Sequence, residues 1–215
     1  MGEYLYCIIR MGETPKMDFE VRGIGNREIR CANYNDLTAV ISETPLKEYK
    51  PTEEYTKEHK NVNLHILENH TLLPVAFGMV FKNKNILLNT MRRLYPVLKK
   101  SLRLVDNKIE LGVKVVIHKE LDVEKTFGKD KEKLRKECEA DFAALDKIAV
   151  QAKAGKLFSE RLVLNRSFLV DREKIDKFSA AVEKLRDKYK KLKIQYTGPW
   201  PPYNFVNIRI MGRGR

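Results

Sequence analysis

The stretch from Tyr196 to Phe205 reads YTGPWPPYNF and contains three of the chain's eight prolines and its only tryptophan. Each proline fixes its own φ angle, removes a backbone donor and restricts the preceding residue to extended geometry. Trp200 lies between two prolines, and Gly198 provides a turn point just before them. We therefore predict a stiff, largely polyproline-like segment that lies at a sheet edge, a corner or a docking surface.

The side chains of this segment are candidates for contact with a partner, because aromatic anchors are frequent hot spots and a rigid segment loses little entropy on binding. The candidate partner-binding residues are Trp200, Pro201, Pro202, Tyr203 and Phe205, together with Arg213 and Arg215 of the C-terminal tail. The alternative is that Trp200 and Tyr203 fill the core of their own domain at a corner. The two interpretations are compatible if a locked corner holds the next strand, expected over residues 206–210, ready to pair with another chain.

The composition is that of a soluble globular protein, with 43% hydrophobic and 33% charged residues in 215. This length allows one large domain or two small ones. No apolar run approaches the roughly 20 residues that span a bilayer, and the first residues lack the features of a signal peptide, so we expect a cytoplasmic protein without membrane contact. Cys7, Cys31 and Cys138 are scattered and odd in number, which favours buried, reduced thiols.

The formal net charge of +13 suits an acidic partner, which could be nucleic acid, an anionic membrane or an acidic protein surface. Most basic residues are mixed with acidic ones, and the densest basic spots are residues 188–193 and the tail, residues 211–215. A basic nucleic-acid-binding protein is therefore an alternative function, since exposed aromatic rings beside basic strands can stack on bases. No RNA-recognition sheet motif accompanies the charge, so a nucleic-acid partner is the weaker hypothesis.

The hydrophobic periodicity predicts two halves that each alternate strands and helices. In the first half, strands are expected over residues 4–10, 19–24, 28–31 and 37–42, an apolar extended run over 72–81, and helices from Thr52 and from Asn85. Pro96 lies within the second helix and predicts a kink or break there. In the second half, the expected elements are a strand over 108–117, a long helix from about 130 to Gly155, a strand over 162–170, a helix capped by Asp171, and short strands over 192–196 and 206–210.

This order of elements predicts an α+β protein of two domains, each with a mixed or antiparallel sheet and helices on one face. We expect an N-terminal domain over residues 1–105, a C-terminal domain over 106–210 and a basic tail over 211–215.

The sequence offers no pattern for catalysis or for a metal or cofactor. His59, His65 and His70 lie on one predicted helix, but only His59 and His70 share a face, about 16 Å apart along the axis. There is no dinucleotide-binding loop, P-loop or nucleophile elbow, and the carboxylates lie beside lysines on helix faces. We expect no catalytic residue, no metal, no cofactor and no small-molecule substrate.

Seven separate stretches resemble the gas vesicle protein F/L family, and they follow one another in the same order over nearly the whole chain. The most specific is GPWPPYNFV over residues 198–206. The others are YLYCII at 4–9, LTAVIS at 37–42, HKNV at 59–62, LPVAFGM at 73–79, ELGVKV at 110–115 and FLV at 168–170, followed by Phe178. The chain departs from the family at Met79, where an LP-x-x-FGT run has threonine, and at Ala76, where a basic residue is common.

The resemblance implies an accessory protein of gas vesicle formation that is not an enzyme and is associated with the vesicle in the cytoplasm. It further implies binding of the hydrophobic shell subunit and of other gas vesicle accessory proteins during nucleation. The fold that it implies is two α+β domains with ferredoxin-like features. A hydrophobic subunit must be kept from aggregating before assembly, and a stiff aromatic segment beside a sheet edge is suited to hold it.

Overall fold

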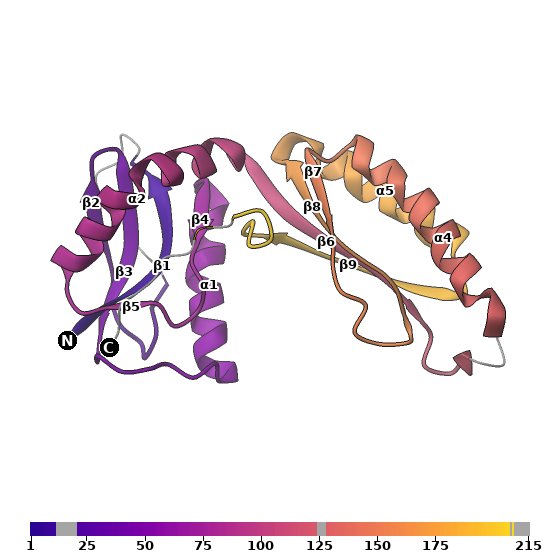
Figure 1. The fold of residues 1–215 in the computed structure, drawn as a ribbon, viewed down its shortest axis with the longest axis horizontal. Coiled ribbons are helices and arrows are strands. Elements are labelled where there is room, and N and C mark those ends of the chain that lie inside the picture. The colour runs from indigo at the N-terminus through magenta and orange to yellow at the C-terminus, as the bar shows by residue number, and fades with distance from the viewer. Residues whose placement is uncertain (12–20, 124–127, 207, 209–215) are drawn as a thin grey trace. The chain divides into compact units, whose positions relative to one another are not determined.

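The computed structural model describes residues 1–11, 21–123, 128–206 and 208, and it confirms the predicted α+β class with two antiparallel sheets (Figure 1). The chain divides into two compact units, Met1–Asn107 with Pro201–Arg215 and Lys108–Trp200. The chain therefore passes from the first unit into the second after Asn107 and returns to the first unit at Pro201.

The first unit is built around its central strand, β1 (Gly2–Arg10). Six consecutive residues, from Tyr4 to Ile9, are each at most 2% exposed, as the unbroken apolar run predicts. The sheet has the order β2-β3-β1-β4, and β5 also pairs with β1. The remaining elements are β2 (Ile29–Tyr34), β3 (Leu37–Thr44), α1 (Glu53–Asn69), β4 (Leu72–Pro74), β5 (Val80–Phe81) and α2 (Lys84–Leu104).

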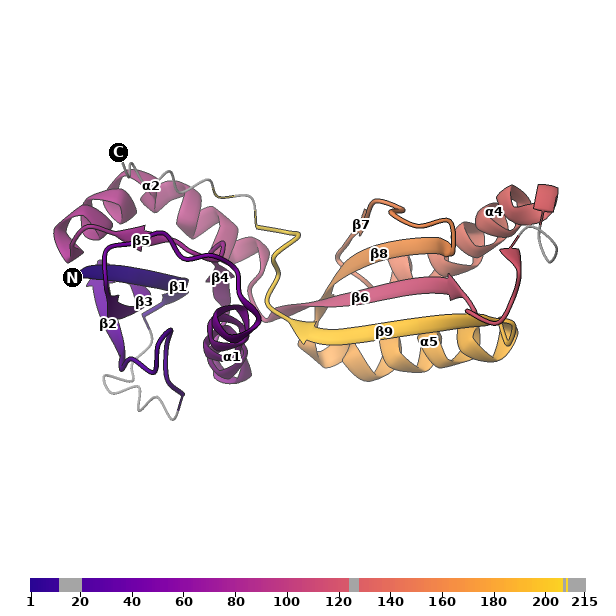
Figure 2. The same ribbon diagram turned by 90° about the horizontal axis from the view of Figure 1, so that it is seen from below.

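The two helices of the first unit cover opposite sides of β1 (Figure 2). Tyr4 and Tyr6 of β1 contact His59 of α1, whereas Tyr34 at the end of β2 contacts Tyr95 of α2. This differs from the expectation that both helices lie on one face. The physical reason is that β1 carries buried side chains on both faces, and each face needs its own cover.

Both helices begin at polar caps, and α2 is continuous through its proline. Thr52 caps α1 and Asn83 caps α2, each by accepting a hydrogen bond from the backbone amide three residues later. The predicted break at Pro96 is wrong, because α2 continues to Leu104. Pro96 is exposed, so the carbonyl of Arg92, which loses its helical donor, faces a side where water can solvate it.

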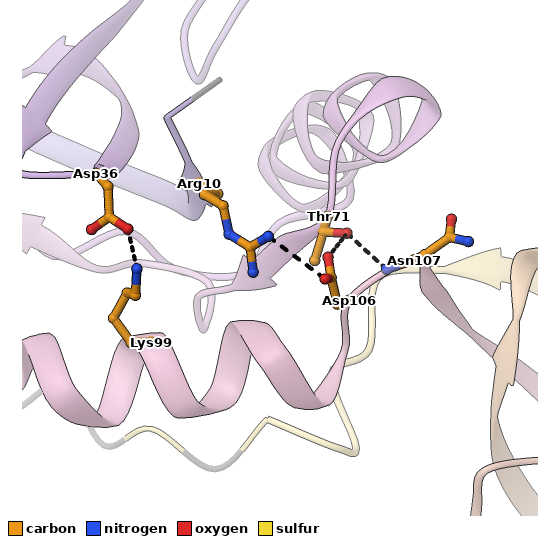
Figure 3. Close-up of polar contacts among 6 residues, drawn as sticks. All are labelled: Arg10, Asp36, Thr71, Lys99, Asp106 and Asn107. Carbon is orange, nitrogen blue, oxygen red and sulfur yellow. Dashed lines mark hydrogen bonds and ion pairs between the residues drawn. The ribbon is translucent and has the colours of Figure 1, made fainter. Parts of the chain in front are cut away.

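The end of α2 is held by polar contacts where the chain leaves the first unit (Figure 3). Thr71 Oγ1 accepts a hydrogen bond from the backbone amide of Asn107 at 3.0 Å and donates one to Asp106 Oδ1 at 3.3 Å. Arg10 Nη1 lies 3.6 Å from the same carboxylate. Asn107 has φ 53°, a left-handed conformation that asparagine tolerates better than most residues. These contacts hold the C-terminal end of α2 and Asn107 against the rest of the first unit.

A second set of contacts ties the middle of α2 to the β2–β3 turn. Asp36 forms an ion pair with Lys99 and accepts a hydrogen bond from Tyr95 Oη at 2.5 Å (Figure 3 shows the ion pair). The hydrogen bond from Lys99, supported by that from Tyr95, holds the pKa of Asp36 below its usual value. The carboxylate is two-fifths exposed, so this pair orients the turn more than it stabilises the unit.

The second unit has the order of elements βαββαβ and the strand order β7-β8-β6-β9, which is the ferredoxin-like arrangement. Its helices lie on one face of the sheet, where Phe168 of β8 contacts Phe178 of α5 at a ring-centroid distance of 5.1 Å. The elements are β6 (Lys108–Ile117), η1 (Gly128–Asp130), α4 (Lys131–Phe142), η2 (Ala143–Lys147), β7 (Gln151–Ala154), β8 (Leu162–Asp171), η3 (Arg172–Lys174), α5 (Ile175–Lys188) and β9 (Leu192–Trp200).

Two predicted features of the second unit are wrong. The long helix expected to reach Gly155 ends at Phe142, and Ala152 instead pairs with Phe168 as part of β7. Alanines fit a helical stripe as well as a strand, and pairing with β8 decides between them. Asp171 does not cap the next helix with its side chain, because its carboxylate binds Lys174 at 2.8 Å and Lys108 at 3.5 Å.

Other expectations concern the cysteines and two short strands. Cys31 is exposed rather than buried, while Cys7 and Cys138 are buried, and all three are free. Of the strand expected over residues 206–210, Val206 and Ile208 are not in a strand, and the other three residues lie outside the described part of the chain. The strand expected over 19–24 also lies partly outside it.

Substituting Gly198 by alanine tests the geometry at the end of β9. Gly198 has φ +123°, and an added Cβ would lie 2.9 Å from the carbonyl oxygen of Glu110 and 2.9 Å from Leu111 Cδ2. We expect Gly198→Ala to lower the free energy of unfolding of the second unit by about 1–3 kcal/mol or more. Urea denaturation followed by the fluorescence of Trp200, the only tryptophan, measures this change.

Gly128→Asn is the matched control in the same unit. Gly128 has φ +38° with nothing within 4 Å of an added Cβ, and asparagine tolerates left-handed geometry. An equal loss of stability in both variants would contradict the assignment of a special constraint to Gly198.

Candidate partner-binding segment

The proline-rich segment is divided between the two units. Its first part, up to Trp200, is the end of β9, which is an edge strand because, of the strands that the structure describes, it pairs with β6 alone. Among the described strands this is an edge position, one of the three that were predicted, but the residues up to Trp200 form a paired strand and not the polyproline-like segment expected there. Trp200 pairs with Glu110 of β6 beyond a register shift, and its side chain is partly exposed.

The second part of the segment, from Pro201, forms a compact turn in the first unit. The amide of Tyr203 donates to the carbonyl of Pro201 at 2.7 Å, and the amide of Phe205 donates to that of Pro202 at 3.0 Å. Pro201, Pro202 and Phe205 are buried, whereas the side chain of Tyr203 is 42% exposed. The buried residues therefore hold the turn in place, and Tyr203 is the accessible ring. Arg213 and Arg215 lie outside the described residues.

The hydroxyl of Tyr203 is connected to the interior through α1. Asn63 Nδ2 donates to Tyr203 Oη at 2.8 Å and lies 3.0 Å from His59 Nε2. His59 Nδ1 lies 3.0 Å from Tyr4 Oη, which also accepts a hydrogen bond from the amide of Gly78 at 2.8 Å. A continuous chain of polar contacts thus runs from an exposed tyrosine to the central strand β1.

Burial of Asn63 is unfavourable in free energy, and its hydrogen bonds must offset this. Asn63 is completely buried, and its Oδ1 has no hydrogen-bond partner among the described residues. An unsatisfied buried carbonyl costs about 1–3 kcal/mol. The presence of an asparagine at this buried position is therefore best explained by the two hydrogen bonds that its Nδ2 donates, one to His59 and one to Tyr203.

His59 is neutral at physiological pH. Burial lowers the pKa of His59 to about 4, and a hydrogen bond with the backbone of Val75 opposes this only partly. Because Asn63 Nδ2 can only donate, His59 Nε2 accepts and the neutral ring carries its hydrogen on Nδ1, facing Tyr4. Protonation of Nε2 would place two donors against each other.

Aromatic rings surround this network. The ring of Tyr4 lies 4.8 Å from that of Tyr6, 5.6 Å from Tyr49 and 6.3 Å from Phe77, measured between centroids. Burial raises the pKa of Tyr6 to about 12, and the Tyr6 hydroxyl bonds Ser42 Oγ at 2.7 Å. The tyrosines are thus protonated hydrogen-bonding groups within a packed core, a structural role for which their chemistry is well suited.

Sequence reasoning identified Tyr203 but missed its partners. His59 and Asn63 are four residues apart, next to Val62 on the apolar stripe of α1. The sequence signal that could have indicated this network is an i,i+4 pair of polar residues on an apolar helix face, because buried polar side chains need hydrogen-bond partners inside the protein. Among the described residues, no group of three His, Cys, Asp or Glu side chains could hold a metal ion. The described helices include none that is both long and apolar enough to cross a membrane.

The fold defines a two-unit α+β protein whose second unit is ferredoxin-like, and comparisons with known proteins identify its family. The family described as gas vesicle synthesis protein GvpL/GvpF matches residues 2–141 and 129–207. Gas vesicle protein F of Haloferax mediterranei is 34% identical over 213 residues, which cover 96% of this chain and 94% of that protein. Gas vesicle protein F1 of Halobacterium salinarum is also 34% identical, over 96% of this chain and 93% of its own length.

Two crystal structures share the fold. GvpF from Anabaena sp. has a TM-score of 0.83 at 22% identity and 97% coverage of both chains. GvpF from Microcystis aeruginosa has a TM-score of 0.82 at 18% identity, over 96% of this chain and 99% of that one. The chain belongs to the GvpL/GvpF family of gas vesicle synthesis proteins. Family membership supports an accessory role in gas vesicles.

The low pKa of His59 predicts that acid destabilises the first unit. The folded pKa of about 4 lies below the ordinary value of 6.5, so the unfolded chain binds more protons between these values. Stability from this residue is complete above pH 6.5 and is lost as the pH falls towards 4, by about 3 kcal/mol in total. Urea denaturation followed by circular dichroism between pH 7.5 and 4.5 measures the loss.

His59→Gln isolates this contribution, because burial also lowers the pKa of His70 and so adds to the pH dependence of the wild type. The variant is expected to be less stable at pH 7.5 but to lose less stability on acidification. The same dependence on pH in both proteins would show that His59 does not titrate in this way.

Proposed function

We propose that this chain is an assembly factor of gas vesicle formation that binds the hydrophobic shell subunit and other accessory proteins during nucleation, without catalysing a reaction. The family match supports the accessory role. The observation that carries the binding role is the exposed ring of Tyr203 on a turn that the buried Pro201, Pro202 and Phe205 hold in place.

Tyr203 has the properties of a preformed anchor. Its hydroxyl is bonded to Asn63, and its backbone is fixed by the bond to Pro201. An aromatic ring that is already ordered loses little conformational entropy when a partner covers it. In this proposal Pro201, Pro202 and Phe205 position the ring rather than touch the partner.

The edge strand β9 offers a second kind of contact in the second unit. An edge strand has unpaired backbone groups to which an extended segment of another chain can add. Trp200 is at the end of this strand and is partly exposed. It would add an aromatic contact where the partner strand ends.

The basic surface is expected to act at long range. A net charge of +13 draws acidic surfaces of partner proteins towards the chain and raises association rates, most strongly at low ionic strength. The tail with Arg213 and Arg215 would contribute to this attraction. The expected location is the cytoplasm, in association with the gas vesicle.

The alternative of nucleic-acid binding receives little support from the ferredoxin-like sheet. The central strands β6 and β8, described throughout, contain one aromatic residue, Phe168, and its ring packs against Phe178 of α5. A stacking platform of the RNA-recognition type requires rings on the open face of these strands.

Capture of the purified shell subunit by this chain tests the anchor. Tyr203→Ala removes the ring and is expected to weaken capture by about 30-fold, the effect of losing a hot spot worth about 2 kcal/mol. Tyr203→Phe keeps the ring and loses only the hydroxyl bond to Asn63, so it should retain most of the binding. Trp200→Ala is expected to weaken capture to a smaller extent.

Thermal denaturation of each variant shows whether the fold is intact. Wild-type capture by a folded Tyr203→Ala protein would remove Tyr203 from the interface. Capture that is lost equally in Tyr203→Phe would mean that the hydrogen bond to Asn63, rather than the ring, is what binding requires.

A further inference from the structure

The helix α2 differs in charge from the other three α-helices that the structure describes. Its 21 residues include no acidic residue, whereas α1, α4 and α5 each contain both signs. On a solvated helix face, opposite charges at i,i+4 stabilise the helix, and like charges at that spacing destabilise it by a similar amount. The six basic residues of α2 are Lys84, Arg92, Arg93, Lys99, Lys100 and Arg103.

The charge of α2 is largely uncompensated within the described residues. Lys99 forms an ion pair with Asp36, but no carboxylate of the described chain lies within ion-pair distance of the other five. Basic residues at the N-terminal end of a helix are also unfavourable for its dipole, as with Lys84. This arrangement is unfavourable for the free protein and favours an external acidic surface.

Apolar side chains lie among these charges on the exposed side. Ile86 is 43% exposed, Val97 48% and Leu104 36%, and Arg93 and Lys100 between them are exposed as well. At 100° per residue these five positions fall within an arc of about 60°, along about 27 Å of the helix. We call this set the α2 stripe. Four of the five buried residues of α2 lie on another side of the helix: Leu87, Met91, Leu98 and Leu102.

We propose that the α2 stripe is a docking surface for an acidic amphipathic helix of a partner protein. The partner would place an apolar seam over Ile86, Val97 and Leu104, and carboxylates beside Arg93 and Lys100. About 18 residues of helix match the length of the stripe. The surface belongs to α2 alone, so the inference does not rest on the function proposed for Tyr203.

Other occupants fit this surface less well. A membrane-bound amphipathic helix must insert its apolar face, but the main apolar side of α2 is buried in its own unit. A second copy of this chain also carries a net charge of +13 and would be repelled. Nucleic acid would use the basic residues but would gain little from the three aliphatic side chains, which suit an apolar seam on a protein.

The test uses the full chain and a fluorescent 18-residue peptide that combines a leucine seam with flanking glutamates. Fluorescence anisotropy should show binding that weakens as salt is added. Arg93→Glu/Lys100→Glu is expected to weaken it at least about tenfold, and Val97→Ser should weaken it several-fold. A peptide with serines in place of the leucines, at equal charge, should bind at least about tenfold more weakly.

Lys184→Glu/Lys190→Glu, at exposed positions of the second unit, makes the same change in net charge and should leave peptide binding unchanged. Failure of the leucine peptide to bind would overturn the proposal. Equal weakening by the control pair, or equal binding of the serine peptide, would also overturn it, because charge alone would then explain the affinity. If the peptide fails to bind but phosphatidylserine vesicles or duplex DNA bind through Arg93 and Lys100, the partner is an anionic membrane or nucleic acid and not a protein helix.

Discussion

The structure of the first unit depends on how two buried tyrosine hydroxyls in its central strand are satisfied. Tyr4 and Tyr6 are fully buried in β1, and a buried hydroxyl without a partner would cost about 1–3 kcal/mol, which would offset much of what burial of the ring contributes. Tyr6 is satisfied by Ser42 and by the amide of Ile24. Tyr4 is bonded by His59 Nδ1 and by the amide of Gly78, and burial together with the contact between Asn63 and His59 Nε2 keeps the ring neutral.

This requirement explains why segments far apart in sequence meet at one place. The loop after β4 supplies the amide of Gly78, α1 supplies His59 and Asn63, and Asn63 in turn holds Tyr203. The exposed anchor is therefore the outer end of a network whose inner end is the core. Packing and the proposed binding surface share the same hydrogen bonds.

Local features of the fold could be predicted because their causes are local. The alternation over residues 108–117 predicted β6 at its observed bounds, and Thr52 caps α1 as expected. The features that were missed depend on distant residues. The end of α4 is decided by the pairing of β7 with β8, and the partner of Tyr203 is 140 residues away in sequence. Periodicity carries no information about such contacts, nor did it indicate that the chain returns to the first unit at Pro201.

That return has a consequence for how the protein is made. The second unit is an insertion within the first, since residues on both sides of it belong to the first unit. During vectorial synthesis the ribosome delivers most of the first unit early, but its last piece, which bears Tyr203, emerges only after the whole ferredoxin-like unit has been translated. A nascent or truncated chain that stops before Pro201 therefore lacks the turn whose Tyr203 bonds Asn63, so the surface we propose for the shell subunit forms only after these residues have been synthesised.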